Sequence, residues 1–200
     1  MAAPVEFWFD FYSPYGYLAS LQIDEIAARH GRATVWRPFL LGPIFQRQGL
    51  APLVEIPLLG DYARHDFARS ARLIGAPFRL PSAFPKAGLA PARAFYWLAE
   101  RDEAKARALA RAVFRAVFVE DRDGADPAVV AELAAPLGIE RDELLAAVAR
   151  PEIKERVKAA TAEAMARGVC GSPFFFVDGE PFWGNDRLWQ VERWLETGGW

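Results

Sequence analysis

The 200-residue sequence has little of the chemistry that builds disulfide or metal sites, because it contains one cysteine, Cys170, and two histidines, His30 and His65. A single cysteine cannot form an intramolecular disulfide. No group of cysteine and histidine has the spacing of zinc ligands, so we expect no metal site. The lone cysteine is also typical of a protein that works in a reducing compartment.

The sequence also lacks the segments that direct a chain into or across a membrane. No apolar run reaches the roughly 18 residues that a membrane span needs. Residues 1–4 have no basic start and no apolar stretch follows them, so we expect no secretion signal. With a net charge of −2, the chain offers no excess of basic residues to nucleic acid or acidic lipid. We therefore expect a cytoplasmic protein whose partners include neither nucleic acid nor a membrane.

The composition that is present is typical of a globular protein, with 52% hydrophobic and 25% charged residues. A chain of this length can form one well-packed domain, or a small domain with a large insertion. The sequence pattern favours the second arrangement.

The first forty residues have the pattern of a β-α-β unit. Residues 5–11 form a short, aromatic-rich run that predicts a buried strand. Ser13 and Pro14 are residue types that favour the N-cap and first position of a helix. We expect this helix to end at Arg29, His30 and Gly31. Residues 33–40 predict a second strand, parallel to the first.

The middle of the chain, from 42 to 168, has no strand pattern and is rich in alanine. The proline-rich stretch 78–88 predicts a loop. Apolar periodicity and boundaries at proline and glycine predict helices over 90–100, 104–119, 127–137, 141–149 and 151–167. His65 falls in a further charged helical stretch.

Strand character returns near the end of the chain. Residues 173–177 predict a strand, and Asp178-Gly179 is a strong two-residue hairpin signal before a returning strand at 180–183. Residues 186–195 predict a closing helix. The sequence thus predicts an α/β fold in which 1–41 and 169–200 form one domain and 42–168 form a large all-helical insertion.

This order of elements resembles the DsbA-like branch of the thioredoxin superfamily, in which a helical domain interrupts the sheet. Oxidoreductases of that branch carry Cys-Pro-x-Cys at the start of the first helix, whereas residues 13–16 here read Ser-Pro-Tyr-Gly. Without either cysteine, the chain has no thiol of its own at that place for disulfide exchange. The resemblance implies a thioredoxin-like domain (β-α-β … β-β-α) around the helical insertion.

Three motifs resemble a narrower family, the 2-hydroxychromene-2-carboxylate isomerases, which are related to kappa-class glutathione transferases. The motifs are 9–18 (Phe-Asp-Phe-Tyr-Ser-Pro-Tyr-Gly-Tyr-Leu), 171–173 (Gly-Ser-Pro) and 183–188 (Trp-Gly-Asn-Asp-Arg-Leu). They follow the family's order along the whole chain. The resemblance implies glutathione as the cofactor, a small aromatic substrate for reversible addition of the glutathione thiolate, and a homodimer.

Ser13 admits two interpretations. As a residue type before a helix it is an ordinary N-cap. It also follows the first strand, where open α/β sheets bind ligands. A serine hydroxyl is a poor nucleophile without a base, and neither histidine is placed to act as one. In the resemblance Ser13 is the catalytic residue, a donor that stabilises the thiolate of bound glutathione with help from the helix N-terminus.

The remaining glutathione-binding residues are expected near the end of the chain. The resemblance implies that Pro173 follows a cis peptide bond, and that the backbone of Ser172 pairs with the cysteinyl part of glutathione. Free helix N–H groups would then bind the γ-glutamyl carboxylate, and an acidic side chain would bind its ammonium. The γ-glutamyl group is expected at Trp183, Gly184, Asn185 and Asp186. Asn185 and Asp186 also read simply as N-caps of the last helix.

The substrate side differs from the family pattern. We expect aromatic residues to line the substrate pocket, namely Tyr12, Phe45, Phe84 and Trp183. Leu50 and Leu59 stand where relatives carry asparagine and lysine, so this side loses polar groups. Cys170, close to Pro173 in sequence, reads as a small core residue.

The resemblance favours a glutathione-dependent isomerase of the 2-hydroxychromene-2-carboxylate isomerase type. A kappa-like glutathione transferase is the nearest alternative, because it would share the first step and keep the thioether. A non-catalytic glutathione-binding module is the alternative from another class, supported by the apolar residues at Leu50 and Leu59.

Overall fold

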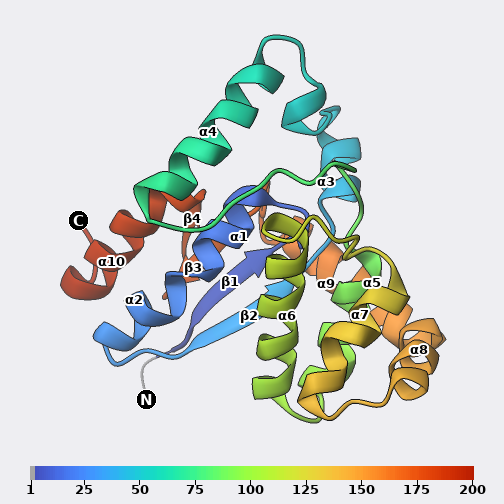
Figure 1. Cartoon of the computed structure of the whole chain (residues 1–200). Helices are drawn as coiled ribbons and strands as arrows, with labels where there is room; N and C mark the ends of the chain where they lie inside the picture. Colours follow the sequence, from blue (N-terminus) through green and yellow to red (C-terminus); the bar gives the residue numbers. More distant parts are fainter. Residues whose placement is uncertain (1–2) are drawn as a thin grey trace.

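The protein is described by a computed structural model that covers residues 3–200. A four-stranded sheet lies at its centre, formed by β1 (Val5–Phe9), β2 (Thr34–Pro38), β3 (Phe174–Val177) and β4 (Glu180–Trp183). The strand order is β2-β1-β3-β4, with β1 parallel to β2 and antiparallel to β3. The strands predicted at the two ends of the chain therefore form one sheet (Figure 1).

Alternating side chains bury both faces of this sheet. On β1, Phe7 and Phe9 point into the main core, and Trp8 between them points into a second core on the opposite face. On β3, Phe175 faces the main core and Phe174 the second. Successive residues of a strand point to opposite faces, so an uninterrupted aromatic run is what a sheet covered on both sides requires.

The helices cover the sheet and continue its main core. Next to the sheet in sequence lie α1 (Pro14–Ser20), α2 (Ile23–Arg29) and, after the short η3 (Asn185–Arg187), α10 (Leu188–Thr197). The intervening helices are α3 (Leu41–Gln48), α4 (Leu59–Leu73), α5 (Leu89–Ala99), α6 (Glu103–Phe118), α7 (Pro127–Ala134), α8 (Arg141–Ala149) and α9 (Pro151–Ala166), with short 3-10 turns η1 (Leu53–Glu55) and η2 (Ala135–Leu137). Within residues 3–200, no helix is long and apolar enough to cross a membrane.

The hairpin at Asp178-Gly179 is confirmed, because both residues have positive φ, 53° and 93°, and β3 pairs with β4 in register around them. The helices expected between 90 and 167 are confirmed as α5 to α9 within a few residues. The fold is thus the predicted thioredoxin-like sheet with a helical insertion. The domain boundaries at 41/42 and 168/169 stay a prediction.

Several predicted element bounds were wrong. The first strand ends at Phe9 rather than at residue 11, and the first helix is divided at residues 21–22. The Ser20 hydroxyl donates to Tyr17 O (2.6 Å) and the Gln22 amide to Leu18 O (3.1 Å), so side chains bind carbonyl groups near the end of α1. Leu21 is 47% exposed at this division.

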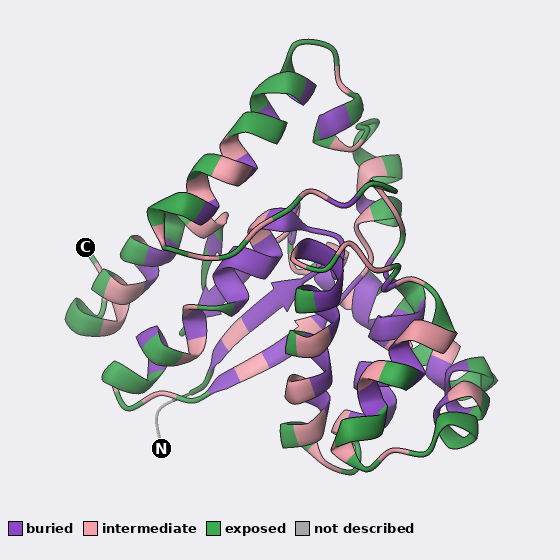
Figure 2. Ribbon diagram, in the orientation of Figure 1, coloured by how far each residue is buried: buried purple, intermediate pink, exposed green. Residues whose placement is uncertain are grey.

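Helices α3 and α4 were not delimited from the sequence. Helix α4 buries only a narrow stripe, Gly60, Ala63, Phe67 and Ala71, and Figure 2 shows it exposed along most of its length. A stripe of one aromatic and small residues gives little periodic signal. In Figure 1, α4 runs along the upper edge of the molecule from the η1 turn toward α10.

Candidate functional site

Ser13 lies between the end of β1 and the start of α1, and its side chain is fully engaged. Its hydroxyl accepts a hydrogen bond from the Gly16 N–H (3.0 Å), as an N-cap does, and donates one to the Ser172 carbonyl (2.9 Å). The residue is 4% exposed. The N-cap interpretation is thus confirmed, and the second hydrogen bond connects this cap to the loop before β3.

The loop before β3 contains a cis peptide bond between Ser172 and Pro173, as predicted. The Ser172 hydroxyl accepts from the Asp10 N–H (2.9 Å). Within residues 3–200 the half-buried Ser172 N–H donates to no protein acceptor. A peptide ligand can therefore pair with the Ser172 backbone as a further strand.

Two glycines let the backbone segments of the site approach closely. A Cβ at Gly16 would lie 3.0 Å from the Ser172 Oγ and 3.1 Å from the Ser13 Cβ. A Cβ at Gly171 would lie 2.3 Å from Nε1 of Trp183. The sequence motifs 13–16, 171–173 and 183–188 therefore come together, and Trp183, 58% exposed, covers the glycine that precedes the cis-proline loop.

The segment after β4 differs from the prediction. Neither Asn185 nor Asp186 caps α10 with its side chain, because the chain enters that helix through the 3-10 turn η3. Asp186 instead pairs with Arg187 (2.6 Å) and has an exposed side chain. The Gly184 N–H donates to Pro173 O (3.0 Å), which ties this segment to the cis-proline loop.

Tyr15 links α1 to α4, a contact that sequence reasoning missed. Its hydroxyl donates to the Asp66 carboxylate (2.5 Å). Burial raises the pKa of Tyr15, and the negative charges of Asp66 and, more weakly, Asp186 raise it further. The charges of Asp66 and Asp186 thus both reach Tyr15 near the start of α1. Only the acidic residue type on an otherwise unassigned helix could have suggested Asp66.

Asp10 is a second functional candidate that sequence reasoning missed. Its carboxylate is buried and accepts from the Tyr12 N–H (2.7 Å) and the Leu41 N–H (2.8 Å). Burial raises the pKa of Asp10 to about 6, against the lowering effect of these two donors. An acidic residue inside the aromatic run 7–12 is the signal that could have identified it, because an aspartate is rarely buried unless its carboxylate has a bonding partner.

The expected substrate residues come from separate elements of the fold. Tyr12 is buried, and its hydroxyl donates to Asp123 (3.1 Å) and accepts from the Ala125 N–H (2.9 Å). Phe45 is half-buried on α3. Phe84, also half-buried, packs against a small apolar cluster that joins η1 to α4. Leu50, Leu59 and Trp183 are about half exposed.

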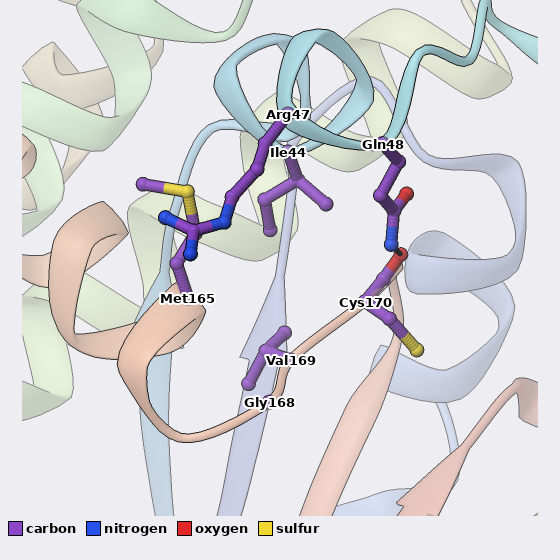
Figure 3. Close-up of a pocket in the computed structure, with 7 residues that line it drawn as sticks. All are labelled: Ile44, Arg47, Gln48, Met165, Gly168, Val169 and Cys170. Atoms are coloured by element: carbon purple, nitrogen blue, oxygen red, sulfur yellow. Dashed lines mark hydrogen bonds between the residues drawn. The ribbon is translucent and has the colours of Figure 1, made fainter.

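Cys170 lies at a separate pocket of about 250 Å³ between α3 and the segment 165–170 (Figure 3). The Gln48 amide donates to Cys170 O (3.3 Å), and Figure 3 shows the cysteine sulfur turned away from Arg47 and Met165. Burial raises the pKa of the Cys170 thiol. A thiol with a raised pKa is a poor nucleophile. Cys170 packs against the second core but is only partly buried, so the expected core position is not fully reached. Among the described residues, no three His, Cys, Asp or Glu side chains are grouped to hold a metal.

The fold and the cis-proline loop facing a helix N-cap define a class, the thioredoxin-like proteins with a helical insertion. A family model for the DSBA-like thioredoxin domain matches residues 4–196. A 2-hydroxychromene-2-carboxylate isomerase of Pseudomonas putida is 31% identical over 194 residues, which cover 94% of this chain and 92% of that protein. The chain belongs to the DSBA-like thioredoxin family and, within it, to the family of 2-hydroxychromene-2-carboxylate isomerases.

Two further comparisons agree with this assignment. The solved structure of a 2-hydroxychromene-2-carboxylate isomerase has a TM-score of 0.84 and 30% identity, covering 96% of this chain and 94% of the other. The protein named glutathione S-transferase kappa 2 from Caenorhabditis elegans is 29% identical over 212 residues, covering 96% of this chain and 91% of that protein.

Proposed function

We propose that this protein binds glutathione and catalyses a glutathione-dependent isomerisation of a conjugated aromatic substrate. The observation that carries the proposal is the direct hydrogen bond between Ser13 and the backbone of Ser172 at the cis-proline. The thioredoxin position that would hold a reactive cysteine holds a hydroxyl, so the thiol must be supplied by a ligand that pairs with this loop.

The residues at the site fit a γ-glutamyl-cysteinyl peptide. The Ser172 N–H and carbonyl can pair with the cysteinyl backbone, because the N–H has no protein acceptor among residues 3–200 and the carbonyl accepts only one hydroxyl there. This pairing places the ligand sulfur toward Ser13. The exposed Asp186 carboxylate, next to the α1 start, then binds the γ-glutamyl ammonium.

When bound, glutathione supplies a thiolate that adds reversibly to a conjugated double bond and leaves after rotation about the resulting single bond. Ser13 donates its hydroxyl proton toward the sulfur, which requires the O–H to turn away from the Ser172 carbonyl. The Gly16 N–H stays bonded to the Ser13 oxygen and strengthens it as a donor. Half-buried Phe45 and Phe84, with Trp183, bind the aromatic part of the substrate.

Incubation with glutathione and 2-hydroxychromene-2-carboxylate, the compound named in the relatives, tests the proposal. We expect conversion to its isomer that requires glutathione, with the free-thiol concentration unchanged at the end. Conversion at the same rate without glutathione contradicts the proposal. As part of the same proposal, the enzyme is cytoplasmic and a homodimer, which cell fractionation and light scattering check.

A kappa-like glutathione transferase is the second candidate, favoured by the similarity to the kappa transferase of C. elegans. It would share the Ser13 chemistry and release a thioether, so the free thiol would fall in step with the substrate. A glutathione-binding module without activity would bind glutathione and leave every conjugated substrate unchanged. The exposed Leu50 and Leu59 are the observation in its favour.

A further inference from the structure

Asp10 is hydrogen-bonded to three separate segments of the site, namely its own loop, the cis-proline loop and the start of α3. Its backbone carbonyl accepts from the Ser13 N–H (3.1 Å), and its backbone N–H donates to the Ser172 hydroxyl (2.9 Å). Its carboxylate accepts from the N–H groups of Tyr12 and Leu41. Leu41 is the first residue of α3, and the N-cap residue of that helix makes no side-chain hydrogen bond to it.

We propose that Asp10 is a positioning residue of the Ser13 site, whose ionised carboxylate holds the loop before Ser13 and the start of α3 in one arrangement. The proposal rests on the proposed function. Helix α3 carries Phe45, which the proposed function assigns to the substrate, whereas the contact with Ser172 uses the backbone of Asp10. Loss of the carboxylate therefore disturbs the loop before Ser13 and the start of α3, and it leaves in place the backbone contact with Ser172, which pairs with glutathione in the proposed function.

The surroundings of the carboxylate make its charge the property that matters. Among the described residues, no Lys, Arg or His side chain offsets the charge of Asp10. The carboxylate is hydrogen-bonded there only to the backbone N–H groups of Tyr12 and Leu41. Tyr12 is the titratable side chain whose pKa the Asp10 charge raises. The other residues that face Asp10 are uncharged. They are Leu41 at the start of α3, Ser172 in the cis-proline loop, and Gly88 before α5, where an added Cβ would lie 3.7 Å from Oδ1 of Asp10.

Protonation or amidation weakens one of these two hydrogen bonds, because a carboxyl hydroxyl is a poorer acceptor than a carboxylate oxygen and an amide NH₂ group is no acceptor. Ionised Asp10 is an acceptor at both oxygens, whereas Asn presents an NH₂ group to one of the two N–H donors. Burial raises the pKa of Asp10 to about 6, so this change falls between pH 4.5 and pH 8. A displacement on the scale of one ångström at the substrate side is enough to lower the rate about tenfold or more.

The experiment combines amide NMR with kinetics over pH 4.5–8 on the full chain. In the wild type we expect the amide proton resonances of Tyr12 and Leu41 to shift together, with one midpoint near pH 6. At saturating glutathione, kcat/KM for the conjugated substrate should rise over the same range. In Asp10→Asn both amide transitions and this acid limb should disappear, with kcat/KM about tenfold lower at pH 7.5 and glutathione affinity within about threefold of wild type.

Asp24→Asn is the control, because Asp24 accepts from Thr34 and Trp36 of β2 and from Arg111 of α6, and it is bonded to none of the residues assigned to the site. This variant should keep the pH profile of the wild type. The proposal is overturned if the Tyr12 and Leu41 amides do not titrate together, or if Asp10→Asn retains the acid limb. Failure of the proposed function would instead be seen as absent glutathione binding in the wild type, and the amide titration would still decide whether Asp10 holds the two segments.

Discussion

Replacing Ser13 by alanine removes two hydrogen bonds of a buried hydroxyl. The Gly16 N–H loses its cap at 3.0 Å, and the Ser172 carbonyl loses its donor at 2.9 Å. Loss of an N-cap costs about 1 kcal/mol, and loss of a second hydrogen bond at a residue that is 4% exposed costs about 1 kcal/mol more. We therefore expect a free energy of unfolding lowered by about 2 kcal/mol, a larger loss than a cap alone would give.

For a chain of this size, that loss corresponds to a melting temperature lower by roughly 4–8 °C. The variant should still fold at 25 °C, and its turnover per folded molecule should fall about a hundredfold or more, as for a lost transition-state donor. Thermal melts by circular dichroism and initial rates with saturating glutathione measure the two effects separately.

Ser20→Ala is the matched control. Ser20 is a buried serine in the same helix, but its hydroxyl donates only to Tyr17 O, within α1. A serine that bonds back to its own helix contributes little to stability. Its replacement should leave turnover unchanged and shift the melting temperature by no more than about 2 °C. Wild-type turnover in Ser13→Ala would refute the catalytic role and leave Ser13 as a helix cap alone.

Four further perturbations test other parts of the site. Asp186→Asn should leave the melting temperature unchanged and weaken glutathione roughly tenfold by calorimetry, with no further loss for an analogue that lacks the γ-glutamyl ammonium; equal losses for both ligands would contradict the assignment. Leu59→Lys should tighten glutathione without loss of stability, because Leu59 is 49% exposed; unchanged affinity would mean that this position does not face the ligand. Gly171→Ala should displace the Trp183 indole, seen as a changed fluorescence spectrum, and weaken glutathione, because the new Cβ would lie 2.3 Å from Nε1. The pKa of Asp10 in the folded protein, about 6, exceeds the ordinary 3.8, so protonated Asp10 favours the folded state. In urea denaturation, the free energy of unfolding of the wild type relative to Asp10→Asn should be highest below pH 4, fall by roughly 3 kcal/mol between pH 4 and pH 6, and then stay level. A difference that does not change with pH would contradict the buried charge.

The sequence was informative where the local signal and the tertiary role coincide. The aromatic run at 5–9 needs burial on both faces, Asp178-Gly179 suits a turn with positive φ, and Ser13-Pro14 begins a helix in any context. The cis bond at Pro173 came from the family resemblance and not from a local preference. These features predicted the sheet and its contact with Ser13.

Other parts of the site depend on packing between distant segments. The Asp10 carboxylate accepts from N–H groups of its own loop and of α3, and the first residue of α3 is followed by a glycine and a proline, which give no helical pattern. Asp66 meets Tyr15 across 51 residues on a helix with a narrow buried stripe. Asn185 was expected as a cap from its residue type, but the 3-10 turn η3 precedes α10 and removes the need for one.

The central claim is that the site stabilises the thiolate of bound glutathione beside Ser13. The direct test is an ultraviolet titration of the thiolate absorbance of glutathione bound to the wild-type protein, which has only one cysteine of its own, with Cys170→Ala as the background. We predict a bound-thiol pKa at least one unit below the value of about 8.5 for a free thiol, returning toward 8.5 in Ser13→Ala. A bound thiol that titrates like free glutathione in the wild type would contradict the account.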